Sequence, residues 1–304
     1  MRYAFINTLI ALAKKDPRII LLTGDLGFTV FEDFSKLLPN QFINMGVAEA
    51  NMLGVATGLA LSGKIPFVYS IATFATMRPF EQIRTDVAVH NANVKIIGSG
   101  AGLSYSDAGS THHAIEDISL MRTIPNMTVI CPSDPTSVEW CTKEAVKIYG
   151  PLYLRLGKKG EERIYKNGSE LKIGKGIILR KGSKVAVFTT GNIVKNVLDA
   201  SDILINKGIK ITVVDLHTIK PVDKKLIEKI AKNHSSIVTV EEHLITGGLG
   251  SAVAEVISEV SSRAILKRIG IADMFIQEMG SQENLRKKLG LDPESIATSI
   301  LKSI

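Results

Sequence analysis

A single carboxylate lies inside an apolar stretch in the first part of the chain. Residues 44–60 read as a helix that is apolar nearly all round, which predicts burial. Glu49 is the one ionisable residue in this stretch, and its helical neighbours are Met45, Gly46, Met52 and Leu53. None of these neighbours can pair with a carboxylate. Glu49 therefore either caps the helix start and stays partly solvated, or is a desolvated acid that hydrogen-bonds a ligand or a reacting ring.

A polar loop with two histidines is the second place where chemistry is expected. Residues 104–117 lie between a predicted strand and a predicted helix, and loops at the carboxyl ends of such strands gather ligands. His112 and His113 are adjacent, so they point apart, and no third metal ligand is suitably spaced. Acid–base chemistry or substrate hydrogen bonding is favoured over metal binding, with simple loop capping as the alternative.

Two further stretches lie at predicted strand ends. Residues 70–84 hold Phe74 and Phe80 together with arginines such as Arg78. Such aromatics usually pack in a core, but one at a strand end can also stack on a flat heterocycle. The glycine run over residues 247–251 opens a predicted helix and suits either a phosphate site or a tight packing turn.

Strand-like and helix-like runs must position these residues, and they alternate along the chain. The alternation predicts an α/β fold with a mostly parallel sheet covered by helices on both faces. Strands are expected over residues 19–23, 67–71, 94–98, 127–131 and 152–156, then 185–189, 209–214, 237–240 and 265–269. Helices are expected over residues 3–14, 47–61, 79–90, 115–122 and 135–148, then 193–206, 223–232 and 249–261, with a last helix opening at Asp292-Pro293.

A glycine- and lysine-rich stretch interrupts this alternation over residues 157–184. We therefore expect two domains, over residues 1–165 and 185–304, joined by a linker over residues 166–184. The second domain is the smaller one.

Composition narrows the class of protein. The 304 residues are 45% hydrophobic and 22% charged, which is ordinary for a globular chain. No apolar run approaches a membrane span, no signal peptide is recognisable, and two cysteines favour a cytoplasmic location. The net charge of +7 suits phosphorylated ligands or a solvated surface. Basic residues are not interleaved with aromatics, so nucleic acid is not an expected partner.

The order and spacing of several segments resemble the transketolase family, in particular its small, split form. Residues 42–52 look like the catalytic-glutamate segment, and Thr73-Phe74 with residues 78–82 is similar to the segment that stacks on the aminopyrimidine ring. Residues 109–113 (Gly-Ser-Thr-His-His) look like the family's Gly-Pro-Thr-His-Gln turn. Residues 122–127, 132–134, 190–192, 219–223, 241–243 and 247–251 extend the match over nearly the whole chain.

The resemblance implies a thiamine-diphosphate pyrimidine-binding domain followed by a transketolase-type C-terminal domain. Glu49 would protonate the pyrimidine ring, and a two-carbon ketol unit would pass from a ketose phosphate to an aldose phosphate in pentose phosphate metabolism. The implied residues group by role. Catalysis would use Glu49 and His112; the cofactor would contact Glu49, Phe74, Met77, Arg78 and Phe80; and the substrate would contact Asp107, His112 and Arg155.

Three positions depart from the family pattern and leave the sugar specificity open. Ala108 stands where the family has the aspartate that reads a substrate hydroxyl, with Asp107 one place earlier. Gly100 replaces a histidine, and Met77 replaces a second stacking aromatic.

The family's metal signature, Gly-Asp-Gly, is absent, because Leu26 follows Gly24-Asp25. The resemblance then implies that a large N-terminal subunit carries Gly-Asp-Gly and holds the diphosphate and Mg²⁺, in an assembly of two large and two small subunits. This chain would supply no metal ligand. The alternatives are the beta subunit of a 2-oxo-acid dehydrogenase, half of a deoxyxylulose-phosphate synthase, and a non-catalytic regulatory subunit.

Overall fold

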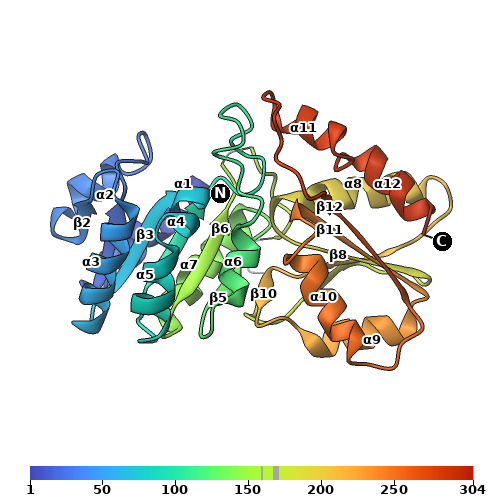
Figure 1. The fold of residues 1–304 in the computed structure, drawn as a ribbon, viewed down its shortest axis with the longest axis horizontal. Helices are drawn as coiled ribbons and strands as arrows, with labels where there is room; N and C mark the ends of the chain where they lie inside the picture. The colour runs from blue at the N-terminus through green and yellow to red at the C-terminus, as the bar shows by residue number, and fades with distance from the viewer. Residues whose placement is uncertain (159, 167–170, 304) are drawn as a thin grey trace.

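Two sheets of mostly parallel strands, each covered by helices, make up the computed structural model (Figure 1). The structure describes residues 1–158, 160–166 and 171–303. The first sheet has seven strands in the order β10-β5-β6-β4-β3-β1-β2, and the second has five in the order β12-β11-β8-β9-β7. The predicted α/β class and two-domain organisation are confirmed.

The first sheet is built from runs of buried apolar residues. Its strands are β1 (Ile19–Thr23), β2 (Phe42–Asn44), β3 (Ile65–Ile71), β4 (Lys95–Ser99), β5 (Thr128–Ile130), β6 (Leu152–Leu156) and, from the second half of the chain, β10 (Thr218–Lys220). Every pairing is parallel except that of β10 with β5. Four of these strands, β1, β3, β4 and β6, are buried at every position, as expected for a parallel sheet covered on both faces.

Helices cover both faces of this sheet. They are α1 (Arg2–Ala13), α2 (Glu32–Leu37), η1 (Pro39–Gln41), α3 (Glu49–Leu61), α4 (Ala72–Met77), α5 (Phe80–Gln82), η2 (Ile83–Ala88), α6 (Asp117–Thr123) and α7 (Pro135–Lys147). Residues of α1 and α7 share one core cluster, whereas residues of α3, η2 and α6 share another. Asp134 caps α7 by accepting from the main-chain N–H of Ser137, and Pro135 is pre-set for the first turn.

The second sheet consists of β7 (Ile177–Arg180), β8 (Val185–Thr189), β9 (Thr212–Asp215), β11 (Ser236–Leu244) and β12 (Ile265–Ile271). Its helices are η3 (Gly191–Ile193), α8 (Val194–Ile205), α9 (Lys224–Asn233), α10 (Leu249–Ser258), α11 (Gln282–Lys288) and α12 (Pro293–Leu301). The linker expected over residues 166–184 includes β7, which pairs antiparallel with β9. Residues 167–170 of that linker lie outside the described residues.

The two domains share a core rather than only touching. The cluster that contains Met52 of α3 and Met121 of α6 continues into Ile227 of α9 and Val253 of α10. Strand β10 leaves the second domain and completes the first sheet by pairing with β5. The first sheet is therefore held by contacts from both halves of the chain. Ligand-binding loops are expected at the carboxyl ends of its strands β3, β4 and β6.

Candidate active site

Glu49 lies at the start of α3 and is 3% exposed. Its carboxylate is paired: Oε1 accepts from Ser70 Oγ at 3.0 Å, and Oε2 accepts from Arg78 Nη1 at 2.9 Å. The expectation of a carboxylate without partners is therefore wrong. Both partners come from outside the helix, from β3 and from the turn after α4, so counting helical neighbours could not find them.

Arg78 links this acid to two aromatic rings. Its guanidinium carbon lies 3.8 Å from the centroid of the Phe74 ring, and Phe74 meets the His112 ring edge-on with 5.0 Å between centroids. We call Glu49, Ser70, Phe74, Arg78 and His112 the Glu49 cluster. The structure thus brings together four of the residues that the sequence selected from three separate stretches.

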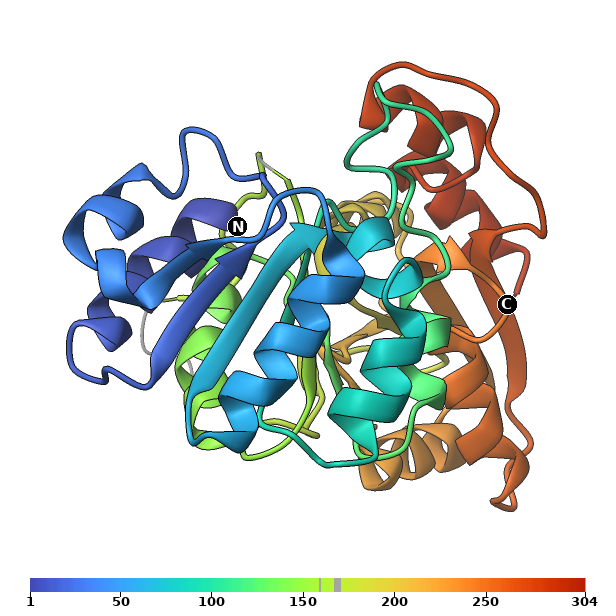
Figure 2. The ribbon, with the colours of Figure 1, turned by 60° about the vertical axis from the view of Figure 1, so that its left-hand side comes forward.

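The loop over residues 100–116 carries His112 to this cluster. A bridge between Gly102 and Ala114 closes the loop, and in Figure 2 it rises beside the segment over residues 272–281. Gly100 has φ +86°, and a Cβ there would lie 2.1 Å from the Tyr105 ring. Tyr105 thus fills the space that a larger side chain at position 100 would need, which explains the departure from histidine in steric terms.

The two histidines differ in environment. Burial, and then the nearby Arg78 charge, lower the pKa of His112, whose Nδ1 lies 2.9 Å from Thr111 Oγ1. His112 is therefore neutral near pH 7 and able to accept or donate a proton. His113 is buried, and burial lowers its pKa as well. In the described parts of the chain no group of three or more His, Cys, Asp or Glu side chains is arranged to hold a metal.

Three other predicted residues lie near the cluster with less direct contacts. Met77 is partly exposed beside Arg78, and Asp107 pairs with Lys158 at 3.4 Å. Phe80 packs against the core cluster that the two domains share. For Phe80 the contacts favour core packing, which the sequence had left open.

The predicted phosphate role of Arg155 needs a correction. Arg155 is 2% exposed, its Nε donates to Asp117 Oδ2 at 2.7 Å, and its Nη2 donates to the main-chain carbonyl of Ala114. In the sequence, a charged residue inside an apolar strand looks the same whether it contacts a ligand or another side chain. Here it serves a buried ion pair instead, so we do not retain Arg155 as a substrate residue.

Lys158 is a cation that sequence reasoning missed. It follows β6 by two residues, and its ammonium lies 4.1 Å from the centroid of the Tyr105 ring, which is itself 6.0 Å from His112. Its place just beyond the carboxyl end of a parallel strand is the signal that could have identified it.

The glycine run over residues 247–251 has a structural role. The carboxylate of Glu241 accepts from the main-chain N–H groups of Leu249 and Gly250 at 2.7 and 2.8 Å. A carboxylate of the same chain already occupies the start of α10, so the packing alternative holds and a phosphate there does not.

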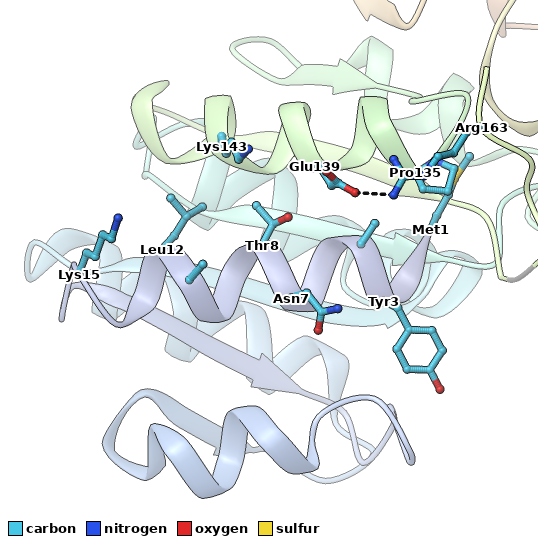
Figure 3. Close-up of a pocket in the computed structure, with 12 residues that line it drawn as sticks. Met1, Tyr3, Asn7, Thr8, Leu12, Lys15, Pro135, Glu139, Lys143 and Arg163 are labelled. Atoms are coloured by element: carbon cyan, nitrogen blue, oxygen red, sulfur yellow. Dashed lines mark hydrogen bonds and ion pairs between the residues drawn. The ribbon is translucent and has the colours of Figure 1, made fainter. Parts of the chain in front are cut away.

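A separate pocket lies elsewhere on the first domain. Figure 3 shows this hollow of about 620 Å³ between α1 and α7, bordered by residues such as Thr8, Leu12 and Lys143. The ion pair of Arg163 and Glu139, at 3.0 Å, lies on its wall. None of the Glu49 cluster lines it, so it is separate from the residues selected for chemistry.

Comparison with known proteins gives matches along both halves of the chain. The model of the transketolase pyrimidine-binding domain matches residues 1–160, and that of the transketolase C-terminal domain matches residues 174–296. A protein of Methanocaldococcus jannaschii named for the C-terminal section of transketolase is 42% identical over 100% of this chain and 96% of its own length.

Two further matches agree with these. The 6-deoxy-6-sulfo-D-fructose transketolase subunit SqwH of Clostridium sp. is 38% identical over 97% of this chain and 92% of its own length. A solved split gene transketolase, described as an inactive beta4 tetramer, superposes with a TM-score of 0.90 at 37% identity, covering 99% of this chain and 97% of that one. Among the described residues, no helix is long and apolar enough to cross a membrane.

Proposed function

We propose that this chain, which belongs to the transketolase family, is the small subunit of a split, thiamine-diphosphate-dependent transketolase. The observation that carries the proposal is the Glu49 cluster. A nearly buried carboxylate at the start of α3 is joined through Arg78 to the Phe74 ring, and that ring touches His112. An acid, a stacking ring and a neutral imidazole within contact of one another suit the pyrimidine end of the cofactor and its substrate.

The residues present fit the pyrimidine half of thiamine diphosphate. Glu49 offers a hydrogen-bonding acid and Phe74 offers an aromatic face beside it. Thr73 adds a buried hydroxyl for which no partner is found among the described residues, as expected where a polar ligand belongs. When bound, thiamine diphosphate supplies the carbon nucleophile that carries a two-carbon ketol unit between sugars.

The chain's own residues supply proton handling and positioning. Glu49 holds a proton at the pyrimidine nitrogen, and Ser70 fixes the orientation of its carboxylate. His112, neutral near pH 7, exchanges a proton with the substrate oxygens. Asp107 and Lys158 form a pair beside Tyr105, whose ring centroid lies 6.0 Å from that of His112.

A second polypeptide would complete the site. Apolar side chains in the loops that follow β1 and β2 are solvent-exposed in this chain, including Phe28 (74%) and Val47 (71%), which lies two residues before Glu49. Exposed apolar surface beside an incomplete site supports burial against a partner. That partner would be a large subunit with Gly-Asp-Gly, which would hold Mg²⁺ and the diphosphate in a two-fold symmetric assembly of two large and two small subunits.

Sugar phosphates are the proposed substrates, within cytoplasmic pentose phosphate interconversion. Lys158 supports an anionic group at the far end of the substrate. The relative from Clostridium is named for a sulfo sugar, which also bears a terminal anion.

The test compares this chain, its large subunit and their mixture by calorimetric titration with thiamine diphosphate and Mg²⁺, and by ketol transfer. Only the mixture should bind tightly and turn over. Tight Mg²⁺-dependent binding and ketol transfer by this chain alone would reject the split-enzyme proposal. Decarboxylation of a 2-oxo acid by the mixture would identify the dehydrogenase alternative, and full activity of a Glu49→Gln mixture would identify a regulatory subunit.

A further inference from the structure

Arg78 occupies the space between the acid and the ring that the proposed cofactor would need. Its Nη1 donates to Glu49 Oε2 at 2.9 Å, and the same guanidinium lies 3.8 Å from the centroid of the Phe74 ring. One flat cation therefore hydrogen-bonds the carboxylate and stacks on the aromatic face at once. This is the pair of contacts that a pyrimidine ring would make.

The two occupants exclude each other. A flat ring stacked on an aromatic lies at about the van der Waals separation, so the guanidinium fills the layer that a heterocycle would take. Glu49 Oε1 is already engaged by Ser70, which leaves Oε2 as the oxygen that Arg78 covers. Resting on the function proposed above, we propose that Arg78 is a placeholder: it fills the pyrimidine half-site until the cofactor enters and then swings out.

The local structure allows such a movement. The Arg78 side chain is 45% exposed and follows the last residue of α4, whereas Glu49 and Ser70 are buried. The long side chain can leave towards solvent while the hydroxyl of Ser70 keeps the carboxylate in position. Until then the guanidinium compensates a nearly buried negative charge that would otherwise be costly. Phe74, freed on the same movement, becomes available for stacking.

The placeholder makes cofactor binding weaker than it would be without Arg78. The experiment is calorimetric titration of thiamine diphosphate and Mg²⁺ into the chain assembled with its large subunit. Arg78→Met removes the charge and the flat group, and it should lower the dissociation constant about tenfold, because a charge-assisted hydrogen bond no longer competes. Arg18→Met, which breaks the exposed pair with Asp16, is the matched control and should bind like wild type.

Two more variants separate competition from a change in folding. Arg78→Lys keeps the charge without a stacking face and should give an intermediate dissociation constant. In a Glu49→Gln background the gain from Arg78→Met should shrink to within about threefold, because a neutral amide does not hold the guanidinium by charge. Melting curves of every assembly exclude unfolded variants.

The outcomes distinguish this inference from the function on which it rests. Binding by Arg78→Met that equals or falls below wild type, while Arg18→Met is unchanged, overturns the placeholder role and makes Arg78 a cofactor ligand. Failure of every assembly, wild type included, to bind thiamine diphosphate overturns the proposed function and this inference with it.

Discussion

Arg155 and Asp117 form a buried ion pair where the two domains meet, with 2.7 Å between Nε and Oδ2. Asp117 opens α6 of the first domain and is 0% exposed. Arg155 also donates to the main-chain carbonyl of Glu242 in β11, a strand of the second sheet. The pair therefore links β6 and α6 of the first domain to β11 of the second.

Breaking this pair should cost stability rather than substrate affinity. Arg155→Ala leaves Asp117 buried without its cation, so we expect the free energy of unfolding to fall by about 3–5 kcal/mol. Urea unfolding measures this loss of stability. Lys224→Ala, which breaks an exposed pair with Glu259, is the control and should change stability by less than about 1 kcal/mol. A fully stable Arg155→Ala variant with a raised KM for phosphorylated sugars would restore the phosphate role.

Glu49→Gln should lower turnover of the assembled enzyme by about a hundredfold or more, because a general acid is lost. The fold should persist, since a glutamine oxygen can still accept from Ser70 Oγ. Steady-state turnover and a melting curve measure the two effects. The control is Glu81→Gln, at an exposed carboxylate in α5. Activity of Glu49→Gln within a few-fold of wild type contradicts the proton role.

Lys158→Ala should raise KM for a phosphorylated acceptor by about tenfold or more, with a smaller effect on kcat. The reason is that a charge contact far from the reacting carbon acts mainly in binding. The same assay with the unphosphorylated sugar should show little change, and Lys143→Ala at an exposed site should leave both unaffected. An equal loss on both sugars would assign Lys158 a structural role.

The stability of the chain should respond to acid through His217. Burial lowers the pKa of His217 to about 4, from an ordinary value of 6.5. Between these values the unfolded chain binds the proton and the folded chain does not, so stability falls as pH falls from about 6.5 to 4. The loss from this group is about 2–3 kcal/mol at pH 4.

Urea unfolding of wild type and His217→Gln across pH 4–7 tests the direction of this pH dependence. The variant should show a flatter loss of stability towards acid. Burial raises the pKa of nearby Asp215 to about 7, which favours the folded state as pH falls, but that contribution is present in both proteins and cancels in the comparison. Parallel curves for the two proteins would mean that His217 binds its proton equally well in the folded and unfolded chains, which contradicts the lowered pKa.

Sequence patterns located the elements that depend on local burial. The strands at Ile19–Thr23, Leu152–Leu156 and Val185–Thr189 match their predicted bounds, because short apolar runs mark buried parallel strands. The sequence missed α4 and the edge strands β2, β7 and β10, which are short. β10 pairs with a strand almost ninety residues earlier, so its partner leaves no local periodic signal.

Sequence reasoning selected most residues of the Glu49 cluster but could not find the contacts between them. Glu49, Phe74, Arg78 and His112 were selected from the sequence, yet the pairing of Glu49 with Arg78 spans 29 positions and depends on tertiary structure. Arg155 was misassigned for the same reason, since its partner Asp117 lies 38 positions away. Residue type limits what a side chain can do, and only packing decides whether it faces ligand or core.

The pairing of β10 with β5 limits how the two domains can be exchanged by recombination. A chimera that takes its C-terminal domain from another protein also imports the outermost strand of the first sheet, with the antiparallel register of Thr218 to Ile130. A donor whose strand does not match would leave β5 as an open edge. Crossover points are therefore better placed so that β5 and β10 are inherited together, which preserves the seven-stranded order of the first sheet.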